Sequence, residues 1–223
     1  MARSNADFSR WVVHELSEQQ KSENGRIVEI GSEPGVGLEE ALKQFPRSRV
    51  WGVDLSPELA SQARSRNRTS VRAGRLSLTV GGVARLAEIA PIDLVFANHV
   101  LYFWHDPEAE LRQIRAFLRP AGLLTLGYQL KQNMPVMAQK YFPRDGHLLY
   151  ETNDQIDGVL RGAGFSNVWG GRDRYPSPAD LGVDRGNGER RRLNKYRREA
   201  GQRRSSQTQR TRSRRLSRGV GPV

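Results

Sequence analysis

The chain has 223 residues, which is enough for one domain with a hydrophobic core and an additional segment. It contains no cysteine, so disulfide bonds, thiolate metal sites and a cysteine nucleophile are excluded. The formal net charge of +12 is concentrated in residues 182–223, which hold 14 Lys or Arg against 3 Asp or Glu, so the remainder is nearly neutral.

The sequence also lacks the usual signals for membranes and metals. No apolar run approaches the roughly 18 residues that a membrane-spanning helix requires, and the first residues contain no apolar signal region. The four histidines are scattered without the spacing of metal ligands. We therefore expect a cytoplasmic protein with no metal site and no membrane partner.

The first predicted elements form a helix followed by a strand–turn–helix unit. Hydrophobic periodicity predicts an amphipathic helix over residues 7–20. A buried strand is expected at Ile27–Ile30, followed by a glycine-rich turn to Gly37 and a helix over Leu38–Phe45. Strand, glycine turn and helix in this order bring backbone amides and a helix N-terminus close to a nucleotide-like ligand.

Three further strands are predicted in the middle of the chain. Val50–Asp54 ends in an acid, and the helix-start signal at Ser56–Glu58 predicts a helix that runs to Ser65. Arg75–Val80 alternates polar and apolar residues, and Ile92–Phe96 is a continuous apolar run. Both patterns are typical of strands.

The last third of the domain has weaker signals. Asp106 opens a helix that Pro120 is expected to end. A fifth strand is expected at residues 123–126. A capping box at Thr152 opens a helix to Gly164, and residues 165–169 are assigned to a sixth strand.

Alternating strands and helices predict the fold class. We expect a Rossmann-like, doubly wound α/β domain whose mostly parallel sheet has helices on both faces. Residues 1–24 are interpreted as an N-terminal helix that acts as a cap or lid, and residues 25–180 as the ligand-binding domain. Residues 181–223 have too few apolar side chains for a core and are expected to be a basic disordered tail.

The spacing of the glycines separates two classes of ligand. A nicotinamide or flavin site has glycines at turn positions 1, 3 and 6, which here hold Gly31, Glu33 and Val36, so only one matches. In the S-adenosylmethionine pattern, an acid is followed by glycines at alternate positions. It falls on Glu29, Gly31, Glu33 and Gly35, where three of the four residues match. The spacing therefore favours the methyl donor.

Residues 7–170 resemble a class I S-adenosylmethionine-dependent methyltransferase of the small bacterial type. The matching segments, in order, are Val28–Gly37, Gly52–Pro57, Asp93–Asn98 and Leu118–Gly122. The resemblance implies S-adenosyl-L-methionine as cofactor and an S-adenosylmethionine-binding domain at residues 25–180. The chain has no Asn-Pro-Pro-Tyr-like motif after the fourth strand, which favours a small-molecule methyl acceptor over a nucleic-acid base.

The resemblance implies a cofactor-binding role for eight residues. They are Glu29, Gly31, Ser32, Gly35, Asp54, Leu55, Val83 and Asn98. The two glycines would let the backbone approach the methionine part of the donor, and Glu29 would anchor that loop.

The other proposed contacts come from later strand ends. Asp54 would bind the ribose hydroxyls while Leu55 packs on the adenine, and Val83 would lie near the adenine edge. Asn98 would approach the methionine end of the donor. Asp54 as a helix-capping acid and Asn98 as a turn residue remain open alternatives.

The chain departs from the family pattern in several places. Glu33 replaces a glycine, and we expect it to weaken donor binding by roughly 1–3 kcal/mol. Gly82 stands where an acid commonly accepts from the adenine amine, a loss of about 1 kcal/mol. Ala121 replaces a glycine after Pro120. The usual seventh strand is expected to be missing, and the tail in its place is either a genuine basic arm or the product of a shifted reading frame.

No catalytic residue is assigned from the sequence. His99, Tyr102 and His105 follow the fourth strand and are candidate bases, although a base is needed only when the acceptor must lose a proton. The segment 129–150 is either a lid over an apolar acceptor or packing against the sheet edge. Two other functions stay open: a methyltransferase fold with weakened or lost catalysis, and a nucleic-acid-associated protein that binds through its tail. The sequence does not indicate the oligomeric state.

Overall fold

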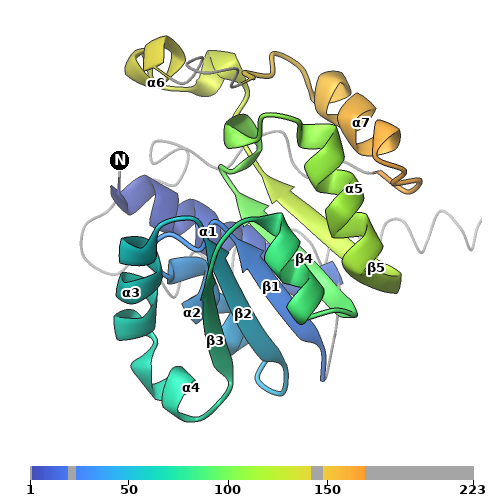
Figure 1. The fold of residues 1–223 in the computed structure, drawn as a ribbon. Helices are drawn as coiled ribbons and strands as arrows, with labels where there is room; N and C mark the ends of the chain where they lie inside the picture. The colour runs from blue at the N-terminus through green and yellow to red at the C-terminus, as the bar shows by residue number, and fades with distance from the viewer. Residues whose placement is uncertain (1, 20–23, 142–147, 169–223) are drawn as a thin grey trace, which may run out of the picture. The chain divides into compact units, whose positions relative to one another are not determined.

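The computed structural model describes residues 2–19, 24–141 and 148–168. Its centre is a five-stranded sheet in the order β3-β2-β1-β4-β5 (Figure 1). The strands are β1 Arg26–Ile30, β2 Arg49–Asp54, β3 Leu76–Val80, β4 Ile92–Asn98 and β5 Leu118–Gly127. All four pairings between neighbouring strands are parallel, which confirms the predicted α/β class.

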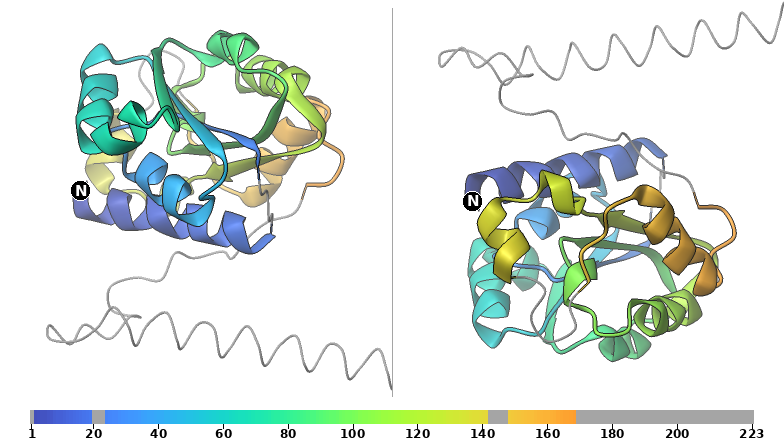
Figure 2. Two further views of the ribbon diagram at one scale, coloured as in Figure 1. Left: turned by 90° about the horizontal axis from the view of Figure 1, so that it is seen from below. Right: turned by 90° about the horizontal axis from the view of Figure 1, so that it is seen from above.

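Helices cover both faces of the sheet, as predicted. They are α1 Ala2–Gln19, α2 Val36–Gln44, α3 Pro57–Arg66, α4 Arg68–Arg72, α5 Pro107–Phe117, α6 Val136–Tyr141 and α7 Asn153–Gly162, with the 3-10 helices η1 Val83–Glu88, η2 Leu101–Phe103 and η3 Lys131–Asn133. Figures 1 and 2 show α1 and α2 on one face of the sheet and η1 and α5 on the other.

Each face has its own hydrophobic core. One core, here called the α1–α3 core, joins these helices to strand residues such as Ile27 and Leu94. The other, the η1–α7 core, joins η1, α5 and α7 to strand residues such as Val28 and Val95. Neighbouring strand residues point to opposite faces, so a sheet covered on both sides needs a continuous apolar run.

The local signals for helix starts are confirmed. The Ser56 hydroxyl accepts from the backbone N–H of Leu59 at 3.2 Å, and Pro57 occupies the first turn of α3. The Asp106 carboxylate accepts from the N–H of Ala109 at 2.9 Å. The capping box at Thr152 is also present. The N-terminal helix begins at Ala2, earlier than the predicted residue 7.

The prediction that Pro120 ends a helix is wrong. Helix α5 already ends at Phe117, and Pro120 lies within β5. The register with β4 shifts there, from Ile92↔Leu118 to Leu94↔Leu123. Proline has no N–H to donate and is tolerated where a ladder is irregular, so regular pairing of β5 begins only at Leu123.

The predicted sixth strand does not form at residues 165–168, and its last residue, Trp169, lies outside the described residues. After α7 the chain turns at Gly164, whose φ is +91°. The N–H of Phe165 donates to the Leu160 carbonyl at 3.0 Å, and that of Gly164 donates to the Arg161 carbonyl at 2.9 Å. This pair of bonds is a Schellman motif, so Phe165 caps the helix and its N–H is not available to a strand.

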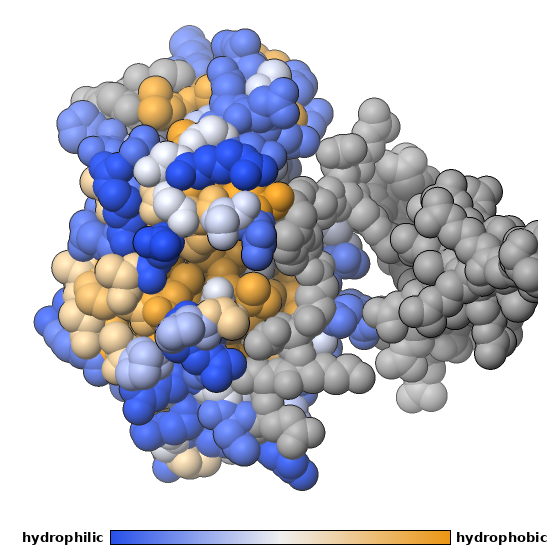
Figure 3. Space-filling view, turned by 90° about the vertical axis from the view of Figure 1, so that its right-hand side faces the viewer, coloured by the Kyte–Doolittle hydropathy of each residue, from blue (hydrophilic) through white to orange (hydrophobic). Residues whose placement is uncertain are grey.

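Within the described ranges, β5 is therefore an edge strand whose single neighbour is β4. Figure 3 looks onto the side of the molecule that carries β5, α5 and α7, and shows hydrophobic surface gathered in a band between hydrophilic regions. The expected basic tail at 181–223 lies outside the described residues, so neither of the two origins considered for it is tested. No helix of the described chain is long and apolar enough to cross a membrane.

Candidate functional site

The residues predicted to bind a cofactor gather at the carboxyl end of the sheet. Glu29, Asp54 and Asn98 lie at or next to the ends of β1, β2 and β4, which are neighbours in the sheet. The chain passes from β1 to β2 on one side of β1, whereas β4 pairs with β1 on its other side, so the strand order reverses at β1. The crevice at such a switch point is where doubly wound sheets bind ligands.

The loop after β1 is held closely against the rest of the protein. Gly31 and Gly35 have φ angles of +70° and +84°, which favour glycine. A Cβ on Gly31 would lie 2.5 Å from Val100 Cγ2, and one on Gly35 would lie 2.9 Å from Ala63 Cα. Both glycines are therefore required by the packing of the protein itself, whether or not the loop also approaches a ligand.

Gly37 has a role that sequence reasoning missed. A Cβ at this position would overlap the carboxylate of Glu29, which is only 2% exposed. Burial raises the pKa of this carboxylate, and the backbone N–H of Leu38, in the first turn of α2, offsets part of that rise. Glycine at position 37 thus leaves room for a buried acid against a helix N-terminus, a favourable place for negative charge.

Three carboxylates influence one another at this loop. Burial, followed by the charge of Glu33, raises the pKa of Glu29 well above its ordinary value of 4.5, and Asp54 adds to the effect. Burial and the charge of Asp54 also raise the pKa of Glu33. Acids whose ionised forms are disfavoured in this way gain when a cation binds beside them.

Asp54 braces the two loops that border the site. One carboxylate oxygen accepts from the backbone N–H of Glu33 at 3.0 Å, and the other accepts from the N–H of Ser56 at 2.9 Å. The cap of α3 is Ser56 itself, so the structure gives Asp54 a bracing role in place of a helix cap. Each of its oxygens keeps a lone pair for a further donor such as a hydroxyl group.

Glu33 stands in an unfavourable backbone conformation. Its φ of +46° lies in the left-handed region, where a side chain is strained and glycine is not. The sequence flagged this position because a glycine is usual there. The positive φ angle means that a glycine would be more stable at position 33 even in the absence of a ligand.

Several buried polar atoms near these acids make no hydrogen bond within the described part of the chain. They are Oε2 of Glu29, Oγ of Ser32 and both amide atoms of Asn98. Asn98 lies close enough to lower the pKa of Glu29, but their atoms do not reach hydrogen-bond geometry. Buried polar atoms are rarely left unpaired, so a ligand with ammonium and carboxylate groups, such as a methionine moiety, fits this place.

The ends of β2 and β3 present apolar surface. Leu55 is 76% exposed and Val80 is 47% exposed. A Cβ on Gly82 would meet only Leu55 Cδ2, at 3.8 Å, so a side chain has room there. Val83 is 3% exposed and belongs to the η1–α7 core, so only its backbone is available to a ligand.

The three candidate bases after β4 differ in their surroundings. His99 has a φ of +55°, and its Nδ1 lies 3.4 Å from the hydroxyl of Tyr102. Burial lowers the pKa of His99 to about 4 and raises that of Tyr102, whose hydroxyl also accepts from the N–H of Gln129. His105 is exposed and precedes the Asp106 cap.

The N-terminal helix reaches the same region. Phe8 of α1 stacks on His99 with ring centroids 4.5 Å apart. A Cβ on Gly127, at the end of β5, would meet Phe8 and overlap the Asn98 side chain. The periodicity of residues 7–20 predicts one apolar face for this helix, but the pairing of Phe8 with His99 could not be inferred because the two residues lie far apart in the sequence. The role of residues 1–24 as a lid stays a prediction.

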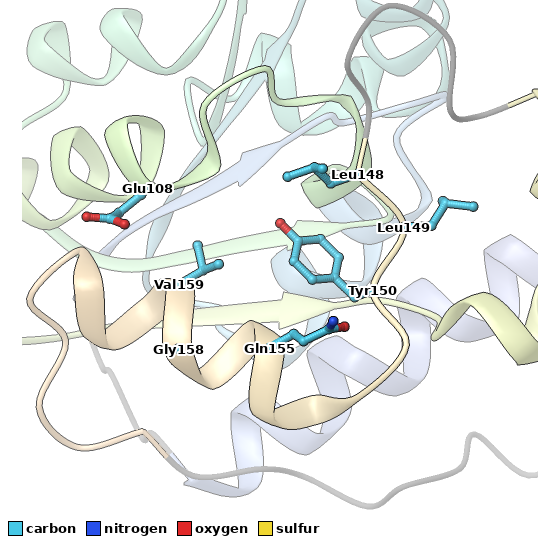
Figure 4. Close-up of a pocket in the computed structure, with 7 residues that line it drawn as sticks. All are labelled: Glu108, Leu148, Leu149, Tyr150, Gln155, Gly158 and Val159. Carbon is cyan, nitrogen blue, oxygen red and sulfur yellow. The ribbon is translucent and has the colours of Figure 1, made fainter.

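A separate surface pocket of about 390 Å³ lies between α5, α7 and residues 148–150. Figure 4 shows its lining residues, with the Tyr150 hydroxyl directed toward the space beside Val159. That hydroxyl is buried and has no hydrogen-bond partner in the described chain. None of the eight predicted cofactor-binding residues lines this pocket. In the segment proposed as a lid, Met134 and Tyr150 are buried in the η1–α7 core and Met137 is exposed.

Metal binding has no support in residues 2–19, 24–141 and 148–168. No group of three or more His, Asp or Glu side chains there has an arrangement that could hold a metal ion.

Comparison with known proteins places the chain in a family. Residues 3–169 match a family described as the methyltransferase domain. Trans-aconitate 2-methyltransferase of Azoarcus sp. is 30% identical over 100 residues, which are 45% of this chain and 37% of that protein. Malonyl-[acyl-carrier protein] O-methyltransferase of Priestia megaterium is 26% identical over 123 residues, 53% of this chain and 43% of that protein. The chain spans less than half the length of these curated relatives.

A solved structure supports the fold. Phosphoethanolamine N-methyltransferase 2 of Haemonchus contortus, in complex with S-adenosyl-L-methionine, aligns with a TM-score of 0.56 and 20% identity. The alignment covers 70% of this chain and 36% of that one. At this identity the likeness concerns the fold alone.

Proposed function

Because the chain belongs to the class I S-adenosylmethionine-dependent methyltransferase family, we propose that it transfers the methyl group of S-adenosylmethionine to a small-molecule acceptor. The observation that carries this proposal is the set of unpaired buried polar atoms on Glu29, Ser32 and Asn98. They lie beside a glycine loop whose acids favour a cation. A donor with an ammonium, a carboxylate and a sulfonium would satisfy all of them.

The residues around the crevice divide the donor between them. Glu29, Ser32 and Asn98 would hold its methionine part, and the spare lone pairs of Asp54 would accept from the ribose hydroxyls. The exposed side chain of Leu55 offers an apolar surface for the adenine. The family resemblance implies these contacts. The residues that would make them lie at or just after the carboxyl ends of β1, β2 and β4.

The bound donor supplies an electrophilic methyl group, so the task of the protein is to position the acceptor. A histidine whose pKa is about 4 is a weak base at neutral pH, and the raised pKa of Tyr102 keeps its proton in place. This favours an acceptor that is nucleophilic without losing a proton, such as a carboxylate. The names of two relatives, which act on trans-aconitate and on a malonyl group, agree with that chemistry.

Isothermal titration calorimetry with S-adenosylmethionine and S-adenosylhomocysteine tests donor binding. We expect saturable binding of both ligands at one site. Asn98→Ala should weaken S-adenosylmethionine binding about tenfold, because it removes a buried amide that has no hydrogen-bond partner in the described chain and is expected to contact the donor. His105→Ala, an exposed change in the next loop, is the matched control. Absence of binding to the unaltered protein would contradict the proposal.

The acceptor is sought with a panel assayed by mass spectrometry for methylated product. Trans-aconitate, a malonyl thioester and phosphoethanolamine represent the groups named in the related proteins. We expect methylation of a carboxylate in preference to the amine. Binding of the donor without turnover of any acceptor would instead support the alternative of a methyltransferase fold that has lost catalysis.

A further inference from the structure

The loop after β1 contains one more acid than the donor-binding pattern requires. Glu33 follows Ser32 directly, and its backbone N–H donates to Asp54 at 3.0 Å. The Glu33 charge is the second largest cause, after burial, of the raised pKa of Glu29. Glu33 therefore lies within electrostatic reach of both acids that are expected to contact the donor.

One basic side chain, Arg66, contacts this loop and is already engaged with other groups. Arg66 of α3 donates to the Pro34 carbonyl at 2.9 Å and forms an ion pair with Glu39 of α2 at 3.4 Å. Burial and the Asp54 charge both raise the pKa of Glu33, so its carboxyl group gains when a cation binds beside it. Glu33 also follows Ser32, whose buried hydroxyl makes no hydrogen bond in the described chain, as is true of Oε2 of Glu29 and the amide of Asn98.

We propose that the Glu33 carboxylate makes this site select positively charged S-adenosylmethionine over its product S-adenosylhomocysteine. The inference rests on the proposed function. In methyl transfer an acceptor lone pair forms a bond to the methyl carbon, while the electrons of the broken carbon–sulfur bond stay on sulfur. The sulfonium becomes a neutral thioether, so the product carries one positive charge fewer than the donor.

The two ligands share their ammonium, carboxylate and adenosine groups. Contacts with those groups therefore affect both affinities about equally and largely cancel in their ratio. The strain of Glu33 and any crowding by its Cβ also act on both ligands, so Glu33 can weaken overall binding and still favour the donor. What remains is the attraction between the acidic loop and the sulfonium, which ends when the methyl group leaves.

The expected size of the effect follows from Coulomb's law. If the sulfonium binds about 6 Å from the Glu33 carboxylate, in a partly buried site with an effective dielectric constant of about 20, the affinity ratio would change by about tenfold after screening. Glu33 would then reduce inhibition by the product without adding a contact that both ligands share.

Calorimetry at pH 8 tests this inference. The dissociation constants of both ligands are measured for the unaltered protein, for Glu33→Gln and for Glu18→Gln, an exposed control on α1. We expect the preference for S-adenosylmethionine to fall about tenfold in Glu33→Gln and to stay unchanged in the control. An unchanged preference in Glu33→Gln would overturn the inference and leave the proposed function standing. If neither ligand binds the unaltered protein, both are overturned.

Two further measurements guard against a variant that does not fold. Glu33→Gly removes the charge together with the backbone strain, and it should reduce the preference by the same factor. Sinefungin, which carries an amine in place of the sulfonium, should behave as S-adenosylmethionine does and lose its advantage over S-adenosylhomocysteine in both variants. Retention of that advantage in both variants would also overturn the inference.

Discussion

The loop after β1 and the segment after β4 border the same crevice and share an unusual backbone feature. Each contains a non-glycine residue in the left-handed conformation, Glu33 with a φ of +46° and His99 with a φ of +55°. Such strain is found most often at functional sites. The two segments differ in charge, however, because the first holds acids and the second holds a histidine that burial keeps neutral.

Under the proposed function, the two sides of the crevice would bind different ligands. The acidic side would hold the cationic donor, and the neutral side, formed by His99, Tyr102 and the stacked ring of Phe8, would face the acceptor. A positively charged imidazole there would repel a sulfonium. The low pKa of His99 removes that repulsion at neutral pH.

The largest expected effect comes from Gly37→Ala, on the acidic side. The new methyl group would overlap the buried Glu29 carboxylate and displace it from the first turn of α2. We expect the free energy of unfolding to fall by about 3 kcal/mol, as in other overpacked sites. Donor affinity should fall at least tenfold. Urea denaturation and calorimetry measure the two effects.

Gly158→Ala is the matched control for this change. Gly158 also lies in a helix, α7, but a Cβ there meets no atom within 4 Å. Alanine should stabilise that helix by up to about 1 kcal/mol. If Gly37→Ala and Gly158→Ala change the free energy of unfolding and the donor affinity equally, the Glu29 carboxylate can move aside and does not require glycine at position 37.

The neutral side predicts a specific dependence of stability on pH. The pKa of His99 is lowered from 6.5 to about 4 in the folded protein, so the unfolded chain binds more protons between these values. The contribution of His99 is fully present above pH 6.5 and is lost as the pH falls to about 4. By linkage this loss amounts to about 3 kcal/mol.

Urea denaturation at pH 7.5, 6, 5 and 4.5 measures this loss, and His99→Asn should reduce it. Asparagine tolerates the left-handed conformation and does not titrate. Because Glu29 and Glu33 have raised pKa values, they oppose the trend and stabilise the fold as the pH falls, so the difference between the two proteins is the informative quantity. His105→Asn is the exposed control. Parallel pH curves for the unaltered protein and His99→Asn would show that His99 is solvated.

Much of the fold could be predicted because its signals are local. The Ser56-Pro57 start of α3 and the capping box at Thr152 depend on residues a few positions apart. Successive side chains of a strand enter the two cores alternately, as expected for strands that are apolar along their whole length. One failure lies where a distant strand decides, because Pro120 is accommodated by a register shift against β4. The other is local: the N–H of Phe165 closes α7 by donating to Leu160, and the segment does not extend the sheet.

The candidate site shows the same limit. Glycine spacing identified the loop and drew attention to Glu33, but it could not show that Gly37 makes room for Glu29 or that Asp54 braces Glu33. The position of Val83 near the adenine edge stays a prediction, and the burial of its side chain in the core could not be inferred from the glycine spacing. The contact of Phe8 with His99 joins two segments far apart in sequence, for which a single sequence carries no signal.

Glu33→Gly tests whether strain or charge dominates on the acidic side. Removing the side chain relieves the left-handed conformation, and we expect a gain in stability of about 0.5–1 kcal/mol. Donor affinity should rise by roughly 1–3 kcal/mol, as the sequence predicted. Ala121→Gly, at a φ of +62° in β5, is the matched control and should raise stability without changing donor affinity. Equal donor affinities for Glu33→Gly and the unaltered protein would contradict this prediction.

The smallest expected effect concerns the adenine end of the acidic side. Gly82 has φ and ψ angles of −92° and −166°, which any residue adopts, and its Cβ position is open except for Leu55 at 3.8 Å. Gly82→Asp restores an acid that can accept from the adenine amine. The affinity for S-adenosylmethionine should rise about fivefold, equivalent to about 1 kcal/mol. Gly82→Ala supplies the same Cβ without the acceptor, so calorimetry of the two variants isolates the hydrogen bond. Equal affinities of both variants would show that the adenine amine does not lie near Gly82, and that the donor occupies the acidic side differently from the way the family resemblance implies.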